Sequence, residues 1–355
     1  MQQTFKARVQ QFWKWFEAEA PRISRMIDDG HAASLASEMS AHFDAMLAGP
    51  AWEFGESTGS EMHELTLTGE GNRHMQFLTA YWKSMAPAIA GWTFHAARQP
   101  SKNPGARPLQ LGDKEIKLPE FLFAPTINDE SQQVDLRLWH PDLSDLPERE
   151  QWLAIFIALD ELLGEFGVQQ WIGAIDLSDK PAKDARSISE LPSYIKQVAE
   201  KTGWEKQSPL ESFTTYEFPQ PHNAFPRGDI MIGTTCHPVL LSEYLHAEGE
   251  MPDPLENTGA DYVWVQLARS VLPEGRETEM RQEIEEQLEQ ALEQQSAGRL
   301  LGGALGAENA YIDLLIFDGA NSVGIIQNVL LQRGLHEGAS LEYFASSKRL
   351  QRVVF

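Results

Sequence analysis

The stretch Arg299–Gly319, RLLGGALGAENAYIDLLIFDG, places three glycines within five residues, at Gly302, Gly303 and Gly306. A phosphate-binding loop has its glycines between a strand and the first turn of a helix, where free N–H groups and the helix dipole converge on the anion. Here a helical pattern precedes the glycines and a strand pattern follows them. The order therefore favours a strand that enters a hairpin over a phosphate loop.

The segments on either side of these glycines complete a regular order of strands and helices. Residues 261–272 alternate aromatic and aliphatic side chains, which predicts a strand. Residues 277–295 carry apolar side chains at steps of four, which predicts an amphipathic helix. The remaining predicted elements are strands at 298–306 and 310–318, a helix at 321–334 and a strand at 340–345. This order is the split β-α-β pattern of ferredoxin-like domains.

The N-terminal half predicts two helices followed by two similar sheet units. Phe5, Val9 and Phe12 recur at steps of four and three, which is one face of a core-packing helix, and a second helix is predicted at Ala32–Leu47. Each sheet unit then has the order strand, strand, helix, strand. The first unit spans 52–100 with a turn at Ser57–Ser60, and the second spans 120–178 with its helix at 147–166.

Two stretches rich in turn-forming residues divide the chain into three predicted regions. These stretches are Ser178–Ser187 and Glu250–Ala260. The three regions are an N-terminal α+β domain at 1–182, a connecting region at 183–258 and a ferredoxin-like domain at 259–355. In the connecting region Phe213–Asp229 contains three prolines and is predicted to be an irregular loop. The fold class is therefore predicted to be multi-domain α+β.

Charge and cysteine content exclude several classes of function. The formal net charge is −23, from 52 acidic and 29 basic side chains. Such a charge repels phosphate backbones and anionic membranes, so we expect no nucleic-acid or membrane partner, whereas a basic protein partner is compatible. The one cysteine excludes an intramolecular disulfide and a cysteine metal cluster. A cytoplasmic, bacterial protein without a cofactor is predicted, and its oligomeric state stays open.

Cys236 and His237 are the candidates for nucleophilic catalysis. They lie between a predicted strand and a predicted helix that begins at Pro238. A thiol near a helix N-terminus has a lowered pKa, and the thiolate is the reactive form. A cysteine nucleophile also needs a base within hydrogen-bond reach, and the side chains of neighbouring residues often diverge. The alternative is a buried structural cysteine, which the flanking apolar residues favour.

Three carboxylates stand out from their surroundings. Asp313 lies on one face of its predicted strand with Tyr311 and Phe317. It is either a site residue with a raised pKa or a polar residue on the open face of the sheet, and we favour the second. Glu161 and Glu165 are four residues apart on a predicted helix. They could hold a divalent ion with other ligands, but a solvated helix edge is the favoured interpretation, and no metal site is predicted.

Several motifs resemble a family of bacterial proteins of unknown function. They are FWKWF at 12–16, APAIAGWTFHAARQP at 86–100, LDELLGE at 159–165 and GALGAENAYIDLLIFD at 303–318. The resemblance implies no activity and no catalytic residue. In its order of elements and its acidity, the C-terminal region also resembles the small ferredoxin-like protein that inhibits bacterial ribonuclease E.

These observations favour a non-enzymatic acidic binding or regulatory protein, one form of which inhibits a basic protein partner. The acidic composition, the predicted sheet faces and the lack of a cofactor fingerprint in the sequence support this interpretation. The alternative is a hydrolase that uses Cys236 or a carboxylate site.

Overall fold

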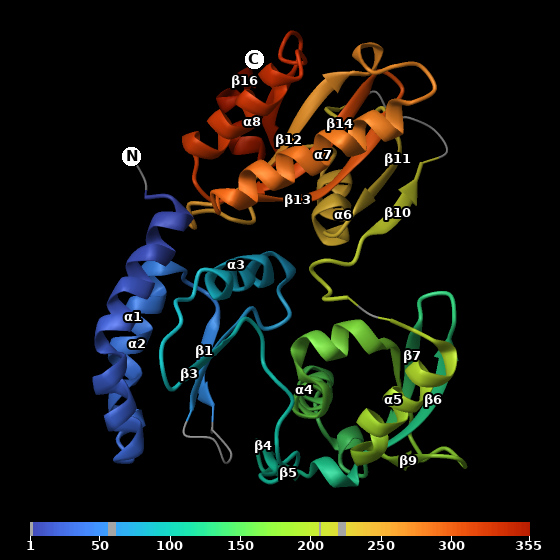
Figure 1. Ribbon diagram of the computed structural model, residues 1–355. Helices are drawn as coiled ribbons and strands as arrows, with labels where there is room; N and C mark the ends of the chain where they lie inside the picture. The colour runs from blue at the N-terminus through green and yellow to red at the C-terminus, as the bar shows by residue number, and fades with distance from the viewer. Residues whose placement is uncertain (1–2, 56–61, 206, 219–224) are drawn as a thin grey trace. The chain divides into compact units, whose positions relative to one another are not determined.

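The computed structural model in Figure 1 describes residues 3–55, 62–205, 207–218 and 225–355, which form two compact units. Unit 1 contains 1–50, 72–89 and 213–355, and unit 2 contains 51–71 and 90–212. The division differs from the predicted boundaries after 182 and 258, because two strands of the predicted connecting region pair with the C-terminal sheet. The N-terminal helices also belong to that unit.

Helices and strands make up unit 1 as follows. They are α1 (Phe5–Asp28), α2 (Ala36–Met46), α3 (Arg73–Ser84), β10 (Thr214–Glu217), β11 (Ile230–Thr235), α6 (Pro238–His246), β12 (Asp261–Ala268), α7 (Glu277–Gln294), β13 (Gly298–Gly306), β14 (Asn309–Ile316), α8 (Ala320–Gln332), β15 (Ser340–Tyr343) and β16 (Val353–Val354). The predicted N-terminal helix is confirmed, since Phe5, Val9 and Phe12 are buried. Trp13 of α1 stacks on Trp82 of α3, with ring centroids 4.7 Å apart.

A seven-stranded sheet with the order β10-β11-β13-β14-β12-β15-β16 organises unit 1. Its central strands β13, β14, β12 and β15 pair antiparallel, and α7 and α8 connect them in the predicted strand-helix-strand-strand-helix-strand order. Both helices pack on one face, where Ile284 and Leu288 of α7 and Ile326 of α8 are fully buried among aliphatic strand residues. The α+β class is confirmed.

The outer edge of β13 is covered by β11, and β11 in turn by β10. An unpaired strand of this length would expose a row of backbone donors and acceptors. The prediction of an irregular loop at Phe213–Asp229 was wrong at Thr214–Glu217, because these residues form β10. Its residues 219–224 lie outside the described part of the chain.

The glycines at 302, 303 and 306 lie inside β13 and not in a loop before a helix, as the strand interpretation predicted. Gly302 has a φ of 148°, and a Cβ there would collide with the carbonyl group of Thr234 on β11. A Cβ at Gly303 would collide with the side chains of Arg281 and Glu285 on α7. The glycines therefore let β11 and α7 approach β13 closely.

Among the described residues, unit 2 contains a three-stranded sheet of order β1-β2-β3, a four-stranded sheet of order β8-β7-β6-β9 and a two-stranded sheet of β4 and β5. In the three-stranded sheet, β1 and β2 pair antiparallel and β3 pairs parallel to β2. In the four-stranded sheet, β6 and β7 pair antiparallel and β8 pairs parallel to β7, as the repeated strand-strand-helix-strand order predicted. The helix of the first repeat, α3, belongs to unit 1. The predicted turn Ser57–Ser60 lies outside the described residues.

The four-stranded sheet of unit 2 packs against α4 and α5 around an aliphatic and aromatic core. Phe123 and Leu136 of the sheet and Leu159 of α4 are among the fully or almost fully buried residues of this core. The elements of unit 2 are β1 (Ala51–Gly55), β2 (His63–Thr68), β3 (Trp92–His95), β4 (Leu109–Leu111), β5 (Lys114–Ile116), β6 (Leu122–Asn128), β7 (Gln133–Trp139), α4 (Glu148–Trp171), β8 (Ile172–Leu177), β9 (Arg186–Ser187) and α5 (Leu191–Thr202). Every helix in the described part of the chain is too short or too polar to cross a bilayer.

Candidate functional sites

Cys236 occupies the predicted place, directly before the N-cap of α6. Its side chain is fully buried, its Sγ is 4.0 Å from the carbonyl oxygen of Leu300, and its N–H donates to the carbonyl of Leu301 at 2.8 Å. The carbonyl of Cys236 accepts a hydrogen bond from Arg73 at 3.1 Å. Burial raises the pKa of the thiol, which disfavours the reactive thiolate. These are the surroundings of a structural cysteine.

His237 is the N-cap of α6, and its ring is committed on both sides. Its Nδ1 accepts a hydrogen bond from the N–H of Leu240 at 3.2 Å, so the neutral ring carries its proton on Nε2. That Nε2–H lies 3.0 Å from the hydroxyl oxygen of Tyr262 and donates to it. Burial lowers the pKa of His237 well below its usual range. The geometry therefore gives His237 a capping role beside Cys236, without a lone pair turned toward the thiol.

The hydrogen bonds continue from Tyr262 to a second histidine on α3. The Tyr262 hydroxyl lies 3.2 Å from Nδ1 of His74, and Nε2 of His74 lies 2.9 Å from a carboxylate oxygen of Glu243. Because Glu243 accepts only, Nε2 of His74 carries the proton, and the Tyr262 hydroxyl donates to Nδ1. Burial also lowers the pKa of His74. The chain of four side chains joins α3, α6 and β12.

His74, Tyr262 and Glu243 were not predicted from the sequence to be members of this network. They lie on three elements, and His74 and Tyr262 are 188 positions apart. The one available signal is His237, since a buried imidazole next to a helix start needs a partner for its second nitrogen. That signal indicates that a partner exists but does not say which residue supplies it.

Asp313 lies on the face of the seven-stranded sheet opposite α7 and α8, and it is only 5% exposed. The favoured interpretation of an open sheet face was therefore wrong for this residue. The guanidinium of Arg227 covers it, with Nη2 donating to Oδ2 at 2.9 Å and Nη1 2.9 Å from Oδ1. Burial raises the pKa of Asp313, and Arg227 counteracts the rise. Opposite charge and hydrogen bonding thus hold a buried carboxylate in the core.

Arg227 itself could not be distinguished in the sequence from an ordinary surface arginine, because it stands in the turn-forming stretch FPRGD at 225–229. Its neighbour Asp229 holds the tip of the β13–β14 hairpin by accepting the N–H groups of Glu308 and Asn309 at 3.0 and 3.1 Å. Tyr311 also donates to Asp229. This anchoring places Arg227 over the sheet next to Asp313.

Glu161 and Glu165 are separated by a break in α4. Gly164 has a φ of 72°, and a Cβ there would lie 2.8 Å from the carbonyl oxygen of Arg98. Glu165 is 4% exposed and accepts the hydroxyl of Thr68 at 2.5 Å and the N–H of Gly71 at 3.0 Å. The interpretation as a solvated helix edge was wrong for Glu165, because the break turns it inward as a structural acceptor.

A polar cavity of about 410 Å³ lies beside Glu161 in unit 2, and its lining includes Glu53, Glu64 and Lys102. Lys102 Nζ is 2.9 Å from Glu64, and Glu161 accepts the N–H of Gly105 at 2.8 Å. Near this cavity, burial and the charge of Glu165 raise the pKa of Asp160 to about 6. The cavity has the composition of a carboxylate site, but Glu64 and Glu161 are already engaged by their own chain.

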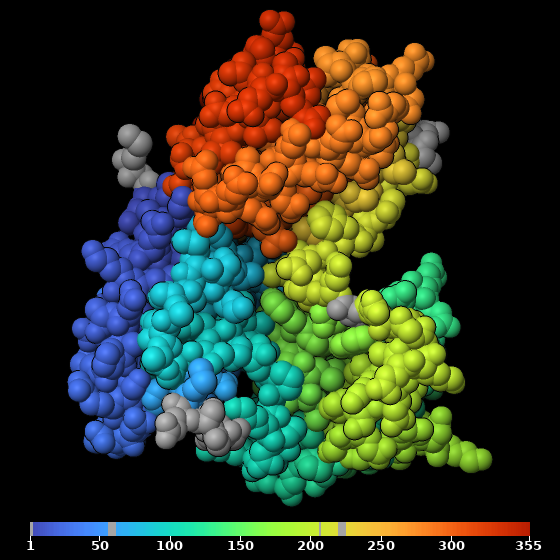
Figure 2. Space-filling model, in the orientation of Figure 1, coloured from blue at the N-terminus to red at the C-terminus, as the bar shows by residue number. Residues whose placement is uncertain are grey.

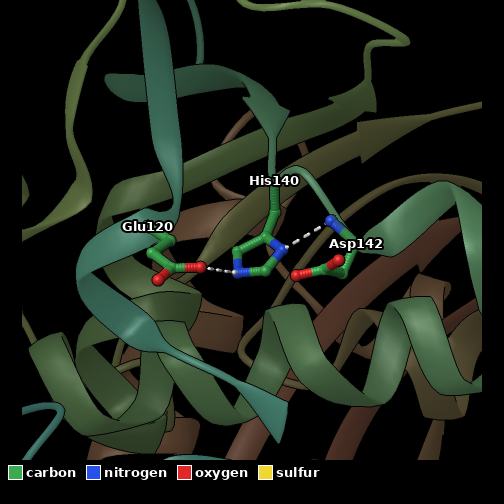
Figure 3. Close-up of side chains that lie close together, drawn as sticks. All are labelled: Glu120, His140 and Asp142. Carbon is green, nitrogen blue, oxygen red and sulfur yellow. Dashed lines mark hydrogen bonds and ion pairs between the residues drawn. The ribbon is translucent and has the colours of Figure 1, made fainter. Parts of the chain in front are cut away.

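Glu120, His140 and Asp142 of unit 2 offer ligand atoms within 4.8 Å of one another, which makes them a candidate metal centre (Figure 3). His140 is 3% exposed, and its Nδ1 accepts the backbone N–H of Asp142 at 3.1 Å. The neutral ring therefore carries its proton on Nε2, which lies 3.8 Å from Glu120. A metal ion needs a free imidazole lone pair. The donor set fits a turn-stabilising histidine better than a metal ligand.

No family model, curated protein or solved structure matches the chain. The resemblances drawn from the sequence motifs stay predictions.

Proposed function

We propose that the chain is a non-enzymatic binding protein that recognises a basic protein surface through the glutamate face of α7. This face is defined as Glu279, Glu283, Glu286, Glu289 and Glu293. The spacing of three, four and seven residues keeps these side chains on the side of the helix away from the buried Ile284 and Leu288. The observation that carries the proposal is this concentration of carboxylates on one rigid helix.

Helix stability does not explain the glutamate face. Negative charges near a helix C-terminus oppose the helix dipole, and the last turn of α7 contains no basic residue. Burial and the charges of Glu293 and Glu286 raise the pKa of Glu289, so the like charges repel one another. Such an arrangement costs a few tenths of a kcal/mol for each like pair. A partner that neutralises these charges would recover that energy.

The free carboxylates lie in the C-terminal half of the face. Glu279 pairs with Arg276 and Glu283 with Arg333. Among the described residues, no ion pair within 4.0 Å joins Glu286, Glu289 or Glu293 to an arginine or lysine, and the charge of Arg299 counteracts part of the rise in the pKa of Glu289. These three carboxylates are therefore available to lysine or arginine side chains of a partner.

The helix that carries the glutamate face is held firmly on its sheet. Ile284, Leu288 and Leu292 are 0% exposed. The opposite side of α7 lies on the surface of unit 1 in the view of Figure 2. A rigid face loses little conformational entropy on binding, which favours recognition by charge complementarity. The partner class that fits is a protein with basic residues along one element, and a complex that covers this element would inhibit any function the element has.

The catalytic alternative has less support from the same unit. A cysteine hydrolase needs a thiolate with a base beside it. The thiol of Cys236 is buried with a raised pKa, and both ring nitrogens of His237 are engaged elsewhere. The geometry therefore favours binding over nucleophilic catalysis.

A pair of charge-matched variants tests the proposal. Glu286→Gln, Glu289→Gln and Glu293→Gln together remove three charges from α7, while Asp176→Asn, Asp179→Asn and Glu211→Gln remove three exposed charges from unit 2. The probe is a fluorescent oligoarginine peptide, titrated at two salt concentrations. We expect the α7 variant to bind the peptide roughly ten-fold more weakly than the parent protein does. For the parent protein, association with the peptide should be slower at the higher salt concentration. Equal weakening in both variants would show that only net charge matters and would overturn the proposal.

A further inference from the structure

The helices α7 and α8 cover only part of the seven-stranded sheet on their side. Ile284 and Leu288 of α7 share a core with Leu305 of β13. β11 and β10 continue the sheet beyond β13, and in Figure 1 they lie to one side of α7. Packed helices lie about 8–10 Å apart and strands about 4.8 Å apart, so one helix covers roughly two strands. The two outer strands therefore offer the width of one more helix next to α7.

The side chains of β11 and β10 on this side form what we call the uncovered surface, defined as Phe213, Thr215, Ile232 and Thr234. Ile232 pairs with Leu305, and Thr215 pairs with Thr234, which places these side chains on the α7 side. Phe213 is 49% exposed and Ile232 is 39% exposed. No helix in the described part of the chain thus shields these two large apolar side chains from solvent.

The flank of α7 forms one wall of the uncovered surface. Arg281 and Glu285 of this flank form an ion pair, and both are almost fully buried. A Cβ at Gly303 would collide with the two side chains, and Gly303 pairs with Thr234 of the uncovered surface. The wall is therefore close to β11, and the ion pair itself contributes no net charge to it.

Carboxylates lie on both sides of the uncovered surface. Burial raises the pKa of Cys236, and the charge of Glu289 raises it further, so Glu289 lies on the flank of α7 toward the end of β11. On the other side, Glu217 of β10 is exposed and pairs in register with Ile232. Arg299 offsets part of the charge of Glu289. The uncovered surface thus combines exposed apolar groups with an acidic border, which is complementary to a cationic, amphipathic element.

We propose that a basic amphipathic helix of a protein partner docks on the uncovered surface, beside and roughly along α7. The proposal rests on the proposed function, because it specifies which element of the same basic partner is recognised. The apolar side of the partner helix would cover Phe213 and Ile232, and its basic residues would meet Glu217 and Glu289. The added helix would complete the helical layer of unit 1.

The dimensions favour a helix over a strand as the docked element. β11 has six residues, so the surface is roughly 20 Å long, which is the length of a helix of about 13 residues. Phe213 and Ile232 are four residues apart in register, or about 13 Å, which matches positions i and i+8 of one helix face. A strand added to β10 would find an edge of only four residues.

Two lysine-rich peptides of about 14 residues and identical composition test the proposal on the full-length chain. In one peptide leucines recur every three or four residues, and in the other the same residues are scrambled so that the helical period is lost. Calorimetry measures each affinity, and circular dichroism measures the helix that the bound peptide gains. We expect the amphipathic peptide to bind at least roughly ten-fold more tightly than the scrambled one and to become helical.

A pair of matched double variants locates the binding. Phe213→Thr/Ile232→Thr removes the exposed apolar groups, while threonine keeps the strand propensity. It should weaken the amphipathic peptide by roughly ten-fold, to the level of the scrambled one. Leu153→Thr/Phe156→Thr removes two similarly exposed side chains from α4 of unit 2 and should leave the affinity unchanged. Neither variant alters a charge, so the binding of oligoarginine should be the same in both.

A single variant keeps the test decisive if the double variant does not fold. Thr215→Lys places a positive charge on the uncovered surface, and lysine is common on edge strands. It should weaken the amphipathic peptide by roughly three-fold through repulsion. Thr126→Lys, at an exposed strand position of unit 2, is its control and should have a smaller effect.

Three results would overturn the proposal. They are equal affinity for the two peptides, no measurable binding of the amphipathic peptide, and binding without a gain of helix, which would indicate strand addition to β10. If the charge variant of α7 still loses oligoarginine binding in these cases, the glutamate face stands without the docked helix. If that variant has no effect while Phe213→Thr/Ile232→Thr does, the failure lies in the glutamate face and not in the uncovered surface.

Discussion

The two faces of the seven-stranded sheet in unit 1 are built from alternate residues of the same strands and yet differ in chemistry. Toward α7 and α8, β12 and β14 present fully buried aliphatic side chains, Val263, Val265, Ile312, Leu314 and Ile316. The opposite face, which we call the ionic face, carries Tyr262, Trp264, Tyr311 and Asp313. It is completed by Arg227, Tyr244 and Phe344 from other segments.

The difference shows two ways in which one sheet can be covered. The aliphatic face is closed by helices that directly connect its own strands, through contacts that need no particular direction. The ionic face is closed by segments distant in sequence, through hydrogen bonds and an ion pair that need exact partners. Substitution of one buried side chain should therefore change the free energy of unfolding by different amounts on the two faces.

The largest effect is expected from breaking the ion pair of the ionic face. Asp313→Asn leaves the buried Arg227 without its counter-charge and should lower the free energy of unfolding by about 3–5 kcal/mol. Arg227→Met/Asp313→Leu removes both charges and should cost much less. Urea denaturation of the three proteins measures the difference. A double variant as unstable as the single one would show that packing, and not charge, dominates this face.

The aliphatic face should respond to lost volume alone. Leu314→Ala removes a fully buried side chain and should lower the free energy of unfolding by about 3 kcal/mol through lost burial and a residual cavity. Leu331→Ala on α8, where the side chain is 53% exposed, is the matched control and should change it by less than about 0.5 kcal/mol. Urea denaturation again provides the measurement. Similar losses at both positions would contradict the packing of α7 and α8 described above.

The aliphatic face could be predicted from the sequence, and the ionic face could not. The four-residue stripe on α7 and the alternation in β14 indicate a shared interior, and both elements are close in sequence. The strand assignment of Gly302 and Gly303 followed from their place after a helix. The pairing of β11 with β13 was missed, because cross-strand partners some 70 residues apart leave no periodic signal.

The candidate sites show the same limit. Cys236, His237 and Asp313 were candidates from the sequence. The residues that contact His237 and Asp313, His74 and Arg227, come from distant segments. Glu165 was assigned to a helix edge because a uniform helix was assumed, and the positive φ of Gly164 breaks that assumption. Sequence periodicity describes regular elements, whereas these sites depend on where the elements are interrupted or meet.

Two histidines that hydrogen-bond to Tyr262 of the ionic face, His74 and His237, give this face a pH dependence that the aliphatic face lacks. His74 and His237 are neutral when buried, and burial lowers the pKa of each below the unfolded value of about 6.5. Below that pH the unfolded chain binds protons that the folded chain does not, so stability should fall with falling pH by up to about 1.4 kcal/mol per pH unit for each histidine. Above it neither state is protonated and the effect vanishes.

Urea denaturation at about pH 7 and at about pH 5 measures this slope, because these values lie on either side of the unfolded histidine pKa of about 6.5. His237→Gln should flatten the slope relative to the parent protein, even if it lowers stability at every pH. His31→Gln, at an exposed position, is the matched control and should leave the slope unchanged. An identical slope in the His237 variant would show that its proton binding does not differ between the folded and unfolded states.

The smallest effect is expected at Cys236, which precedes His237 and tests whether this thiol serves structure or catalysis. Its side chain is fully buried, and burial raises the pKa of the thiol. Cys236→Ser should lower the free energy of unfolding by about 1 kcal/mol, because the hydroxyl is more costly to bury than the thiol. Alkylation by iodoacetamide should be slow in the folded protein and should occur at the rate at which the protein unfolds. A nucleophilic cysteine would instead be labelled quickly at pH values well below the usual cysteine pKa of about 8.5. Rapid labelling that titrates near neutral pH would contradict the structural role, and it would make the hydrolase the leading hypothesis for this chain.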